Sequence, residues 1–198
     1  MIKKVYMAGP DIFRVEWPET AMRIVGTCEA WGFEPLLPIP AERSLDHPGV
    51  SGITVPGTAP DARRVFEACL EMVRSCDAVV ADITPFRGDE PDSGTVFEIA
   101  TAYSLRKPVI AYTRDTQLTH ERHAHNGSST KNGAMLCRSG LLVERFGLPC
   151  NVMVAQACLE IVFGDVVDAL SALKRWVTLA APVPWRSWLS IQDEDKPC

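Results

Sequence analysis

The chain has 198 residues, enough for one globular domain with a substantial core. Hydrophobic residues make up 46% and charged residues 23%, which excludes a disordered or fibrous chain. Twenty basic against 25 acidic residues give a net charge of −5, which argues against general nucleic-acid binding because that needs a basic face. The apolar runs are too short for a membrane span, and the N-terminal lysines precede no signal-peptide core or cleavage site. We therefore expect a cytoplasmic protein that binds neither nucleic acid nor membranes.

Seven cysteines raise the question of disulfide bonds, but their number is odd. No two of them form a CxxC pair, so neither a zinc ribbon nor a thioredoxin-type redox site is supported. A reduced cysteine packs as a small hydrophobic residue, and we expect reduced structural cysteines in a reducing compartment. The cysteines that lie among apolar neighbours are Cys28, Cys69, Cys76 and Cys158.

Apolar residues alternate between strand-like and helix-like spacing along most of the chain. The middle of Asp77–Ile83 is almost wholly apolar, which is typical of a strand buried on both faces of a parallel sheet. In chain order, the expected elements are strand Lys4–Ala8, a helix from Pro18 to Gly32, strand Pro35–Pro40, helix 65–76, strand Asp77–Ile83, helix Thr95–Leu105, strand Pro108–Tyr112, helix Asn151–Cys158, strand Leu159–Phe163 and helix Val166–Trp176.

This alternation predicts an α/β fold, with a parallel sheet and helices on both of its faces. Residues 41–59 lack periodicity and are expected to form a loop. Residues 114–147 are polar, and this segment is long enough to be a functional loop. We predict a single domain at 1–176, followed by an extended tail at 177–198.

Parallel sheets bind ligands at the carboxyl ends of their strands, which directs attention to the loops Gly9–Phe13 and Thr84–Ser93. Asp92 can cap the helix that follows the second loop, and Glu98 lies about one and a half turns later. The helix dipole is expected to keep this carboxylate ionised, which suits a nucleophile. The plainer alternatives are that Asp92 is only a cap and Glu98 only a solvated residue. The apolar neighbours of Glu98 argue against the second alternative.

Other candidate sites are weaker. His120, His123 and His125 form an HxxHxH cluster, but no matching set of carboxylates or cysteines accompanies it, and we expect no metal. The glycine-rich motifs GxGxxG and GxxxxGK[ST] are absent, so dinucleotide and P-loop sites are not supported. Spacing alone therefore leads to an α/β protein with one suggestive pair of carboxylates.

Three segments carry a resemblance to a known family. They are VYMAGPDIF at 5–13, CDAVVADITPFRGDEPDSGTVFEIATAYSLRKPV at 76–109 and FGLPCNVM at 146–153. In this order they closely resemble the nucleoside 2-deoxyribosyltransferases. The resemblance implies a flavodoxin-like, doubly wound, five-stranded parallel sheet. It also implies a homo-oligomer that exchanges the base of a 2′-deoxyribonucleoside without a cofactor.

The resemblance also implies roles for individual residues. Glu98 matches the nucleophile, which would form a covalent deoxyribosyl-enzyme ester resolved by a second base. Tyr6 matches a tyrosine that orients this carboxylate, and Asp92 matches the aspartate that accepts a hydrogen bond from the 5′-hydroxyl. A fixed anion beside the reacting carbon suits the oxocarbenium-like transition state of glycosidic cleavage.

Four further residues are expected at the substrate. Phe13 matches an aromatic residue that lies against the base, and Gly9 belongs to the AGP motif of the first segment. Asn151 and Met153 match an N-x-M motif that reaches into the adjacent subunit's pocket. The active sites would then be shared between subunits, and a monomer would be inactive.

One position departs from the family pattern. Relatives carry an Asn or Asp facing the base eight residues before the aspartate that begins the third strand, and counting back from Asp77 gives Cys69 here. A thiol is a poor hydrogen-bonding substitute, so a proton for the leaving base must come from elsewhere.

Two other functions stay open. The first is a nucleoside 5′-monophosphate N-glycosidase, a hydrolase with the same glutamate. The retained Asp92 and Asn151 argue against it, whereas Arg14, Arg23 and Arg87 are available to hold a phosphate. The second is a non-catalytic nucleotide-sensing module, for which Glu98 would be dispensable.

Overall fold

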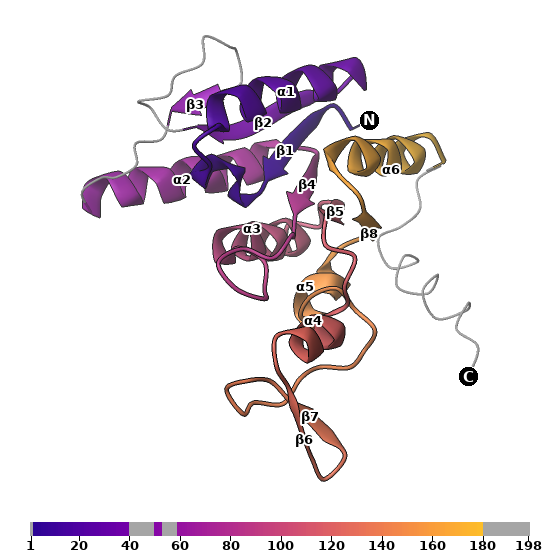
Figure 1. Ribbon diagram of the computed structural model, residues 1–198. Helices are drawn as coiled ribbons and strands as arrows, with labels where there is room; N and C mark the ends of the chain where they lie inside the picture. Colours follow the sequence, from indigo (N-terminus) through magenta and orange to yellow (C-terminus); the bar gives the residue numbers. More distant parts are fainter. Residues whose placement is uncertain (1, 40–49, 53–58, 180–198) are drawn as a thin grey trace.

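The computed structural model describes residues 2–39, 50–52 and 59–179 (Figure 1). A parallel sheet forms its centre, with the strand order β3-β2-β1-β4-β5-β8. The order β2-β1-β4-β5-β8 is that of a flavodoxin-like, doubly wound sheet, as the resemblance implies. A short edge strand, β3, extends this five-stranded core to six. The strands are β1 (Lys4–Ala8), β2 (Glu34–Ile39), β3 (Val50–Gly52), β4 (Ala78–Asp82), β5 (Val109–Thr113) and β8 (Glu160–Phe163).

Helices cover both faces of the sheet and give two separate hydrophobic cores. Helices α1 (Trp17–Ala30) and α6 (Val166–Leu179) pack on one face, where they meet Val5 and Ile110. The other face is covered by α2 (Ala59–Ser75), α3 (Ser93–Ser104) and α5 (Val152–Ala157). Because side chains alternate along a strand, β1 directs Val5 to the first face and Tyr6 to the second.

The chain changes direction at β1, which lies between β2 on one side and β4 on the other. The connections from β1 and β4 therefore leave in opposite directions, and their carboxyl ends border a crevice where such sheets bind ligands. The short 3-10 helix η1 (Pro10–Phe13) follows β1 at this edge. The loop from Thr84 to Asp92 follows β4 there.

Most expected strands and helices agree with the structure to within a few residues, and α6 continues to Leu179. Two expectations are wrong: α2 begins at Ala59, six residues before the expected start, and residues 50–52 of the expected loop form β3, which pairs in parallel with β2. The segment 114–147 holds helix α4 (Thr119–His125) and the antiparallel hairpin of β6 (Ser129–Lys131) and β7 (Ala134–Leu136). Figure 1 shows this hairpin projecting from the body of the molecule. Most of the loop expected at 41–59, and the tail from residue 180, lie outside the described residues. Among the helices that are described, none is long and apolar enough to cross a membrane.

Replacing Gly9 tests the close approach of β1 to β4 at this edge. A Cβ atom at position 9 would lie 3.0 Å from Cβ of Asp82, which is only 1% exposed. We expect Gly9→Ala to lower the free energy of unfolding by about 1–2 kcal/mol because the packed neighbour must shift.

Gly26→Ala is the matched control, since nothing lies within 4 Å of a Cβ atom at this helical position. It should raise the free energy of unfolding by up to about 1 kcal/mol through helix propensity. Urea unfolding of both variants measures the difference, and a similar change in both would contradict the close approach.

Candidate active site

The centre of the site is a hydrogen bond between the sheet and helix α3. Tyr6 of β1 is fully buried, and its hydroxyl group donates to Oε1 of Glu98 over 2.6 Å. The pKa of Tyr6 is raised well above its ordinary value, first by burial and then by the negative charge of Glu98. The phenol therefore remains a proton-bearing donor, and it fixes one oxygen of the carboxylate.

Burial raises the pKa of Glu98 to about 7. The hydrogen bond from Tyr6 opposes this shift, and the negative charge of Asp92 adds to it. The expectation that the helix dipole keeps Glu98 fully ionised is therefore wrong. Glu98 lies beyond the first turn of α3, where the dipole is weak, and removal from water is the larger effect.

Cys69 of α2 completes this cluster. Its thiol interacts with both Tyr6 and Glu98, so position 69 does face the candidate nucleophile. Burial, and then the charge of Glu98, raise the pKa of Cys69 to about 11. The thiol stays protonated at neutral pH and is a weak donor to its neighbours.

Asp92 is the N-cap of α3. Its Oδ2 accepts hydrogen bonds from the backbone N–H of Thr95 over 3.0 Å and from the Thr95 hydroxyl over 3.2 Å. The capping interpretation of Asp92 is thus confirmed, yet its charge also acts on Glu98. A cavity of about 310 Å³ lies along the loop from Phe86 to Ser93 and includes Asp92 in its lining.

Ionic contacts to buried aspartates hold the loop that carries Gly9 and Phe13. Asp11 is buried and accepts a hydrogen bond from Nε of Arg14 over 2.7 Å. Nη1 of Arg114 lies 3.0 Å from Oδ2 of Asp82, and Nη2 of Arg114 lies 3.9 Å from Oδ2 of Asp11. Arg114 thereby links the carboxyl ends of β4 and β5 to the loop after β1.

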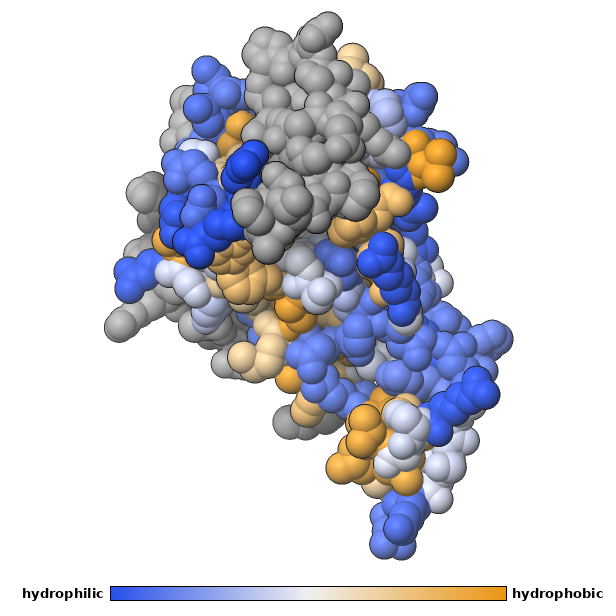
Figure 2. All heavy atoms as spheres, turned by 90° about the vertical axis from the view of Figure 1, so that its left-hand side faces the viewer, coloured by the Kyte–Doolittle hydropathy of each residue, from blue (hydrophilic) through white to orange (hydrophobic). Residues whose placement is uncertain are grey.

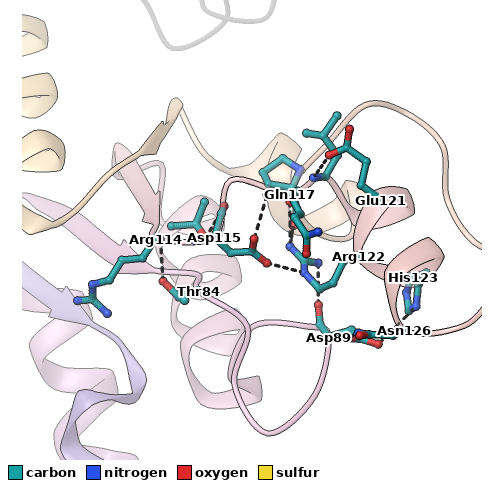
Figure 3. Close-up of polar contacts among 12 residues, drawn as sticks. Thr84, Asp89, Arg114, Asp115, Gln117, Glu121, Arg122, His123 and Asn126 are labelled. Atoms are coloured by element: carbon teal, nitrogen blue, oxygen red, sulfur yellow. Dashed lines mark hydrogen bonds and ion pairs between the residues drawn. The ribbon is translucent and has the colours of Figure 1, made fainter.

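Arg122 of α4 joins three segments that are distant in sequence (Figure 3). Its side chain is 5% exposed, and its Nε donates to Oδ2 of Asp115 over 2.8 Å. Its two Nη groups donate to the backbone carbonyls of Asp89, Gln117 and Pro149 at 2.8, 3.1 and 3.0 Å. Asp89 precedes the cap of α3, and Pro149 precedes Asn151. Sequence reasoning missed this residue because only the folded chain brings its acceptors together.

Asn151 and Met153 lie at the start of helix α5. Asn151 caps α5, since its Oδ1 accepts from the Met153 N–H over 2.9 Å. Met153 is 77% exposed and lines a groove with Val96 and Ala100 of α3. With 3.6 residues per helical turn, these two positions lie about 160° around α3 from Glu98. The chain that carries Glu98 therefore turns its own Met153 to the opposite side of the helix.

The histidine cluster of α4 is divided among different neighbours. His123 Nδ1 lies 3.4 Å from Oδ2 of Asp89, while His120 Nδ1 is buried without a hydrogen-bond partner in the described part of the chain. Over residues 2–39, 50–52 and 59–179, no group of three or more His, Cys, Asp or Glu side chains has an arrangement that could hold a metal ion.

Comparison with known proteins decides the family. The family model described as "Nucleoside 2-deoxyribosyltransferase" matches residues 5–153. The chain belongs to this family. Membership in the nucleoside 2-deoxyribosyltransferase family supports an enzyme of the glycosyl transferase or hydrolase type that acts on nucleosides. Among curated proteins, no sequence matches this chain.

Solved structures agree with this family. A 2-desoxiribosyltransferase from Leishmania mexicana is similar at 29% identity and a TM-score of 0.63, covering 87% of this chain and 97% of that one. The 2-deoxyribosyltransferase from Bacillus psychrosaccharolyticus is 16% identical with a TM-score of 0.51, over 93% of this chain and 95% of that one. A conserved protein from Enterococcus faecalis V583 is 20% identical with a TM-score of 0.54, over 88% and 99%. The last two similarities concern the fold alone.

Replacing Arg122 tests the link among the loops of the site. Arg122→Met leaves the Asp115 carboxylate and three backbone carbonyls without their donor. We expect the free energy of unfolding to fall by about 2–4 kcal/mol, because buried and partly buried backbone carbonyls lose their donor.

The matched control is Arg145→Met, which changes an exposed arginine of the same segment. It should alter the free energy of unfolding by less than about 0.5 kcal/mol. Both values come from urea titrations, and an equally small effect at Arg122 would show that its contacts contribute nothing to stability.

Proposed function

We propose that this protein transfers the 2′-deoxyribosyl group between nucleobases through a covalent intermediate on Glu98. The observation that carries the proposal is the Tyr6–Glu98 hydrogen bond of 2.6 Å at the ligand-binding edge of the sheet. Family membership supplies the class of reaction. A buried carboxylate with one oxygen fixed by a phenol is a preorganised nucleophile.

The reaction requires two displacements at the anomeric carbon. The free oxygen of Glu98 attacks C1′, the bond from C1′ to the base nitrogen breaks, and its electron pair leaves with the base. A nitrogen of the second base then attacks C1′ and gives up its proton to water, the bond from C1′ to the ester oxygen breaks, and Glu98 returns to a carboxylate. Two inversions retain the β-configuration of the nucleoside.

Asp92 supports a free 5′-hydroxyl rather than a 5′-phosphate as the substrate's end group. Its charge reaches Glu98, so it lies near the position proposed for the sugar. Because a phosphate dianion beside this carboxylate would be repelled, a nucleoside 5′-monophosphate is a poorer substrate. Arg14, a candidate phosphate ligand, already pairs with Asp11 over 2.7 Å. These contacts favour the transferase over the hydrolase of the same fold.

The sites are proposed to be shared within a homo-oligomer. Met153 lies on the side of α3 opposite its own Glu98, so it can meet a substrate only in another subunit. Exposed apolar side chains also mark the segment after β7, where Leu141 and Leu142 are solvent-accessible. Figure 2 shows hydrophobic residues near the projecting end of the molecule, with further hydrophobic residues across the middle of the same face. Such patches are typical of surfaces that contact another chain.

Base exchange tests the function directly. Purified protein is incubated with 2′-deoxyinosine and adenine, and separately with a deoxynucleoside 5′-monophosphate alone, and the products are separated by chromatography. We expect new 2′-deoxyadenosine and an unchanged monophosphate.

Glu98→Gln should abolish exchange, whereas Glu71→Gln, which alters an exposed carboxylate on α2, should not. Free base from the monophosphate without exchange would establish the hydrolase instead, and exchange by Glu98→Gln would disprove the nucleophile.

The same assay gives the expected pH dependence. Attack needs the carboxylate form of Glu98, and the raised pKa of about 7 means that the ionised fraction falls as the pH drops below this value. We expect kcat/KM to fall about tenfold per pH unit below pH 7. Activity that is unchanged down to pH 5 would contradict a protonated Glu98 in this range.

Co-expression of two inactive variants tests the shared sites. Glu98→Gln removes the nucleophile, and Met153→Glu places a charge where the neighbouring subunit's pocket is expected. Each variant alone should be inactive, whereas random pairing in a dimer should restore about a quarter of wild-type activity. Mixed chains that stay inactive, although a size measurement shows that they assemble, would contradict the sharing.

A further inference from the structure

Arg87 occupies an unfavourable backbone conformation beside the site. It lies in the loop between β4 and α3 and has a φ of +54°, in the left-handed region that favours glycine. The next residue is Gly88. An arginine kept in such a conformation suggests that its side chain has a task that glycine cannot perform.

The Arg87 side chain lies across two aromatic rings. Its guanidinium carbon is 4.9 Å from the ring centroid of Phe13 and 4.7 Å from that of Phe86. The rings stack on each other at 5.5 Å with an interplanar angle of 24°. Phe13 is nevertheless 48% exposed, so part of its ring remains open to a ligand.

The guanidinium keeps its hydrogen-bond donors for a ligand. A guanidinium that packs on rings still presents its N–H groups at its edge. Within the part of the chain that the structure describes, the Arg87 guanidinium lies against these two rings and makes no hydrogen bond. The unused donor edge of Arg87 and the ring of Phe86 line the cavity of about 310 Å³ along this loop. The exposed ring of Phe13 stacks on Phe86 and lies under the same guanidinium.

Charge identifies the kind of ligand that fits. The same cavity is lined by Asp89, Glu90 and Asp92, which would repel a phosphate dianion. A flat, uncharged heterocycle avoids this repulsion, stacks on an aromatic ring and offers in-plane acceptors to the guanidinium. Arginine is well suited to the carbonyl oxygen and ring nitrogen of a 6-oxopurine.

We propose that Arg87 determines base specificity by donating hydrogen bonds to the carbonyl oxygen of a 6-oxopurine that stacks on Phe13. This inference rests on the proposed function and names the substrate class of that same site. Hypoxanthine and guanine nucleosides are therefore preferred. The exocyclic amine of adenine is a donor, and it would face a second donor at this position.

The same contact assists bond cleavage. When the bond between C1′ and the base nitrogen breaks, the base receives the electron pair and its negative charge spreads to the carbonyl oxygen. Arg87 stabilises this charge, and water protonates the base after it has left. This help matters because Cys69, the side chain beside Glu98, is a weak donor.

The test compares two donors with one common acceptor. kcat and KM are measured for 2′-deoxyinosine and 2′-deoxyadenosine, each with guanine at a fixed concentration. We expect Arg87→Gln to lower the ratio of their kcat/KM values about tenfold, mainly through loss with 2′-deoxyinosine. Arg87→Lys keeps the charge without the planar fork and should give a smaller loss.

Arg106→Gln is the matched control. Arg106 is also exposed and has a φ of +56°, but it follows the last turn of α3. Arg106→Gln should leave the ratio of the two kcat/KM values unchanged. This control shows that replacing an arginine with a left-handed backbone does not by itself change the ratio.

The outcomes separate the alternatives. Equal losses with both donors after Arg87→Gln would overturn the inference and leave Arg87 a packing role. A loss confined to cleavage of 2′-deoxyinosine 5′-monophosphate would overturn it in favour of phosphate binding. If the wild-type protein exchanges bases and Arg87→Gln leaves the ratio of the two kcat/KM values unchanged, only this inference fails. If the wild-type protein exchanges no base at all, the proposed function fails with it.

Discussion

The hydrogen bond from Tyr6 to Glu98 is the contact around which this edge of the sheet is arranged. The Glu98 carboxyl group is buried away from water, which is costly for a polar group. The Tyr6 phenol and the Cys69 thiol offset this cost by supplying hydrogen bonds. The three neighbours of Glu98 come from different elements: Tyr6 lies on β1, Cys69 on α2 and Asp92 at the start of α3. The chemistry proposed for Glu98 thus depends on the packing of two helices against one face of the sheet.

The strands and the position of Glu98 could be predicted because their signals are local. β4 and β5 are buried along their whole length, and their sequences are largely apolar. Glu98 stands out as a charged residue among apolar neighbours. The protonation of Glu98 could not be predicted, because burial depends on α2, which lies elsewhere in sequence. The links through Arg122 and Arg114 were hidden for the same reason: each joins residues about thirty positions apart.

Two helix starts at the site share one support. Asp92 caps α3 and Asn151 caps α5. Arg122 donates to the backbone carbonyl of Asp89, three residues before the first cap, and to that of Pro149, two residues before the second. A single guanidinium therefore orients the entry into both helices. This gives the segment 114–147 a structural part in the site, although nothing in its sequence singles out Arg122.

The raised pKa of Glu98 also couples ligand binding to solution acidity. At pH 7 about half of the molecules carry a proton on this carboxyl group, since its pKa is about 7. A positively charged sugar analogue that pairs with the carboxylate therefore expels close to half a proton per molecule bound. The released proton is taken up by the buffer, so the heat of binding depends on the buffer's ionisation enthalpy. Calorimetry in two buffers would count protons at a single side chain.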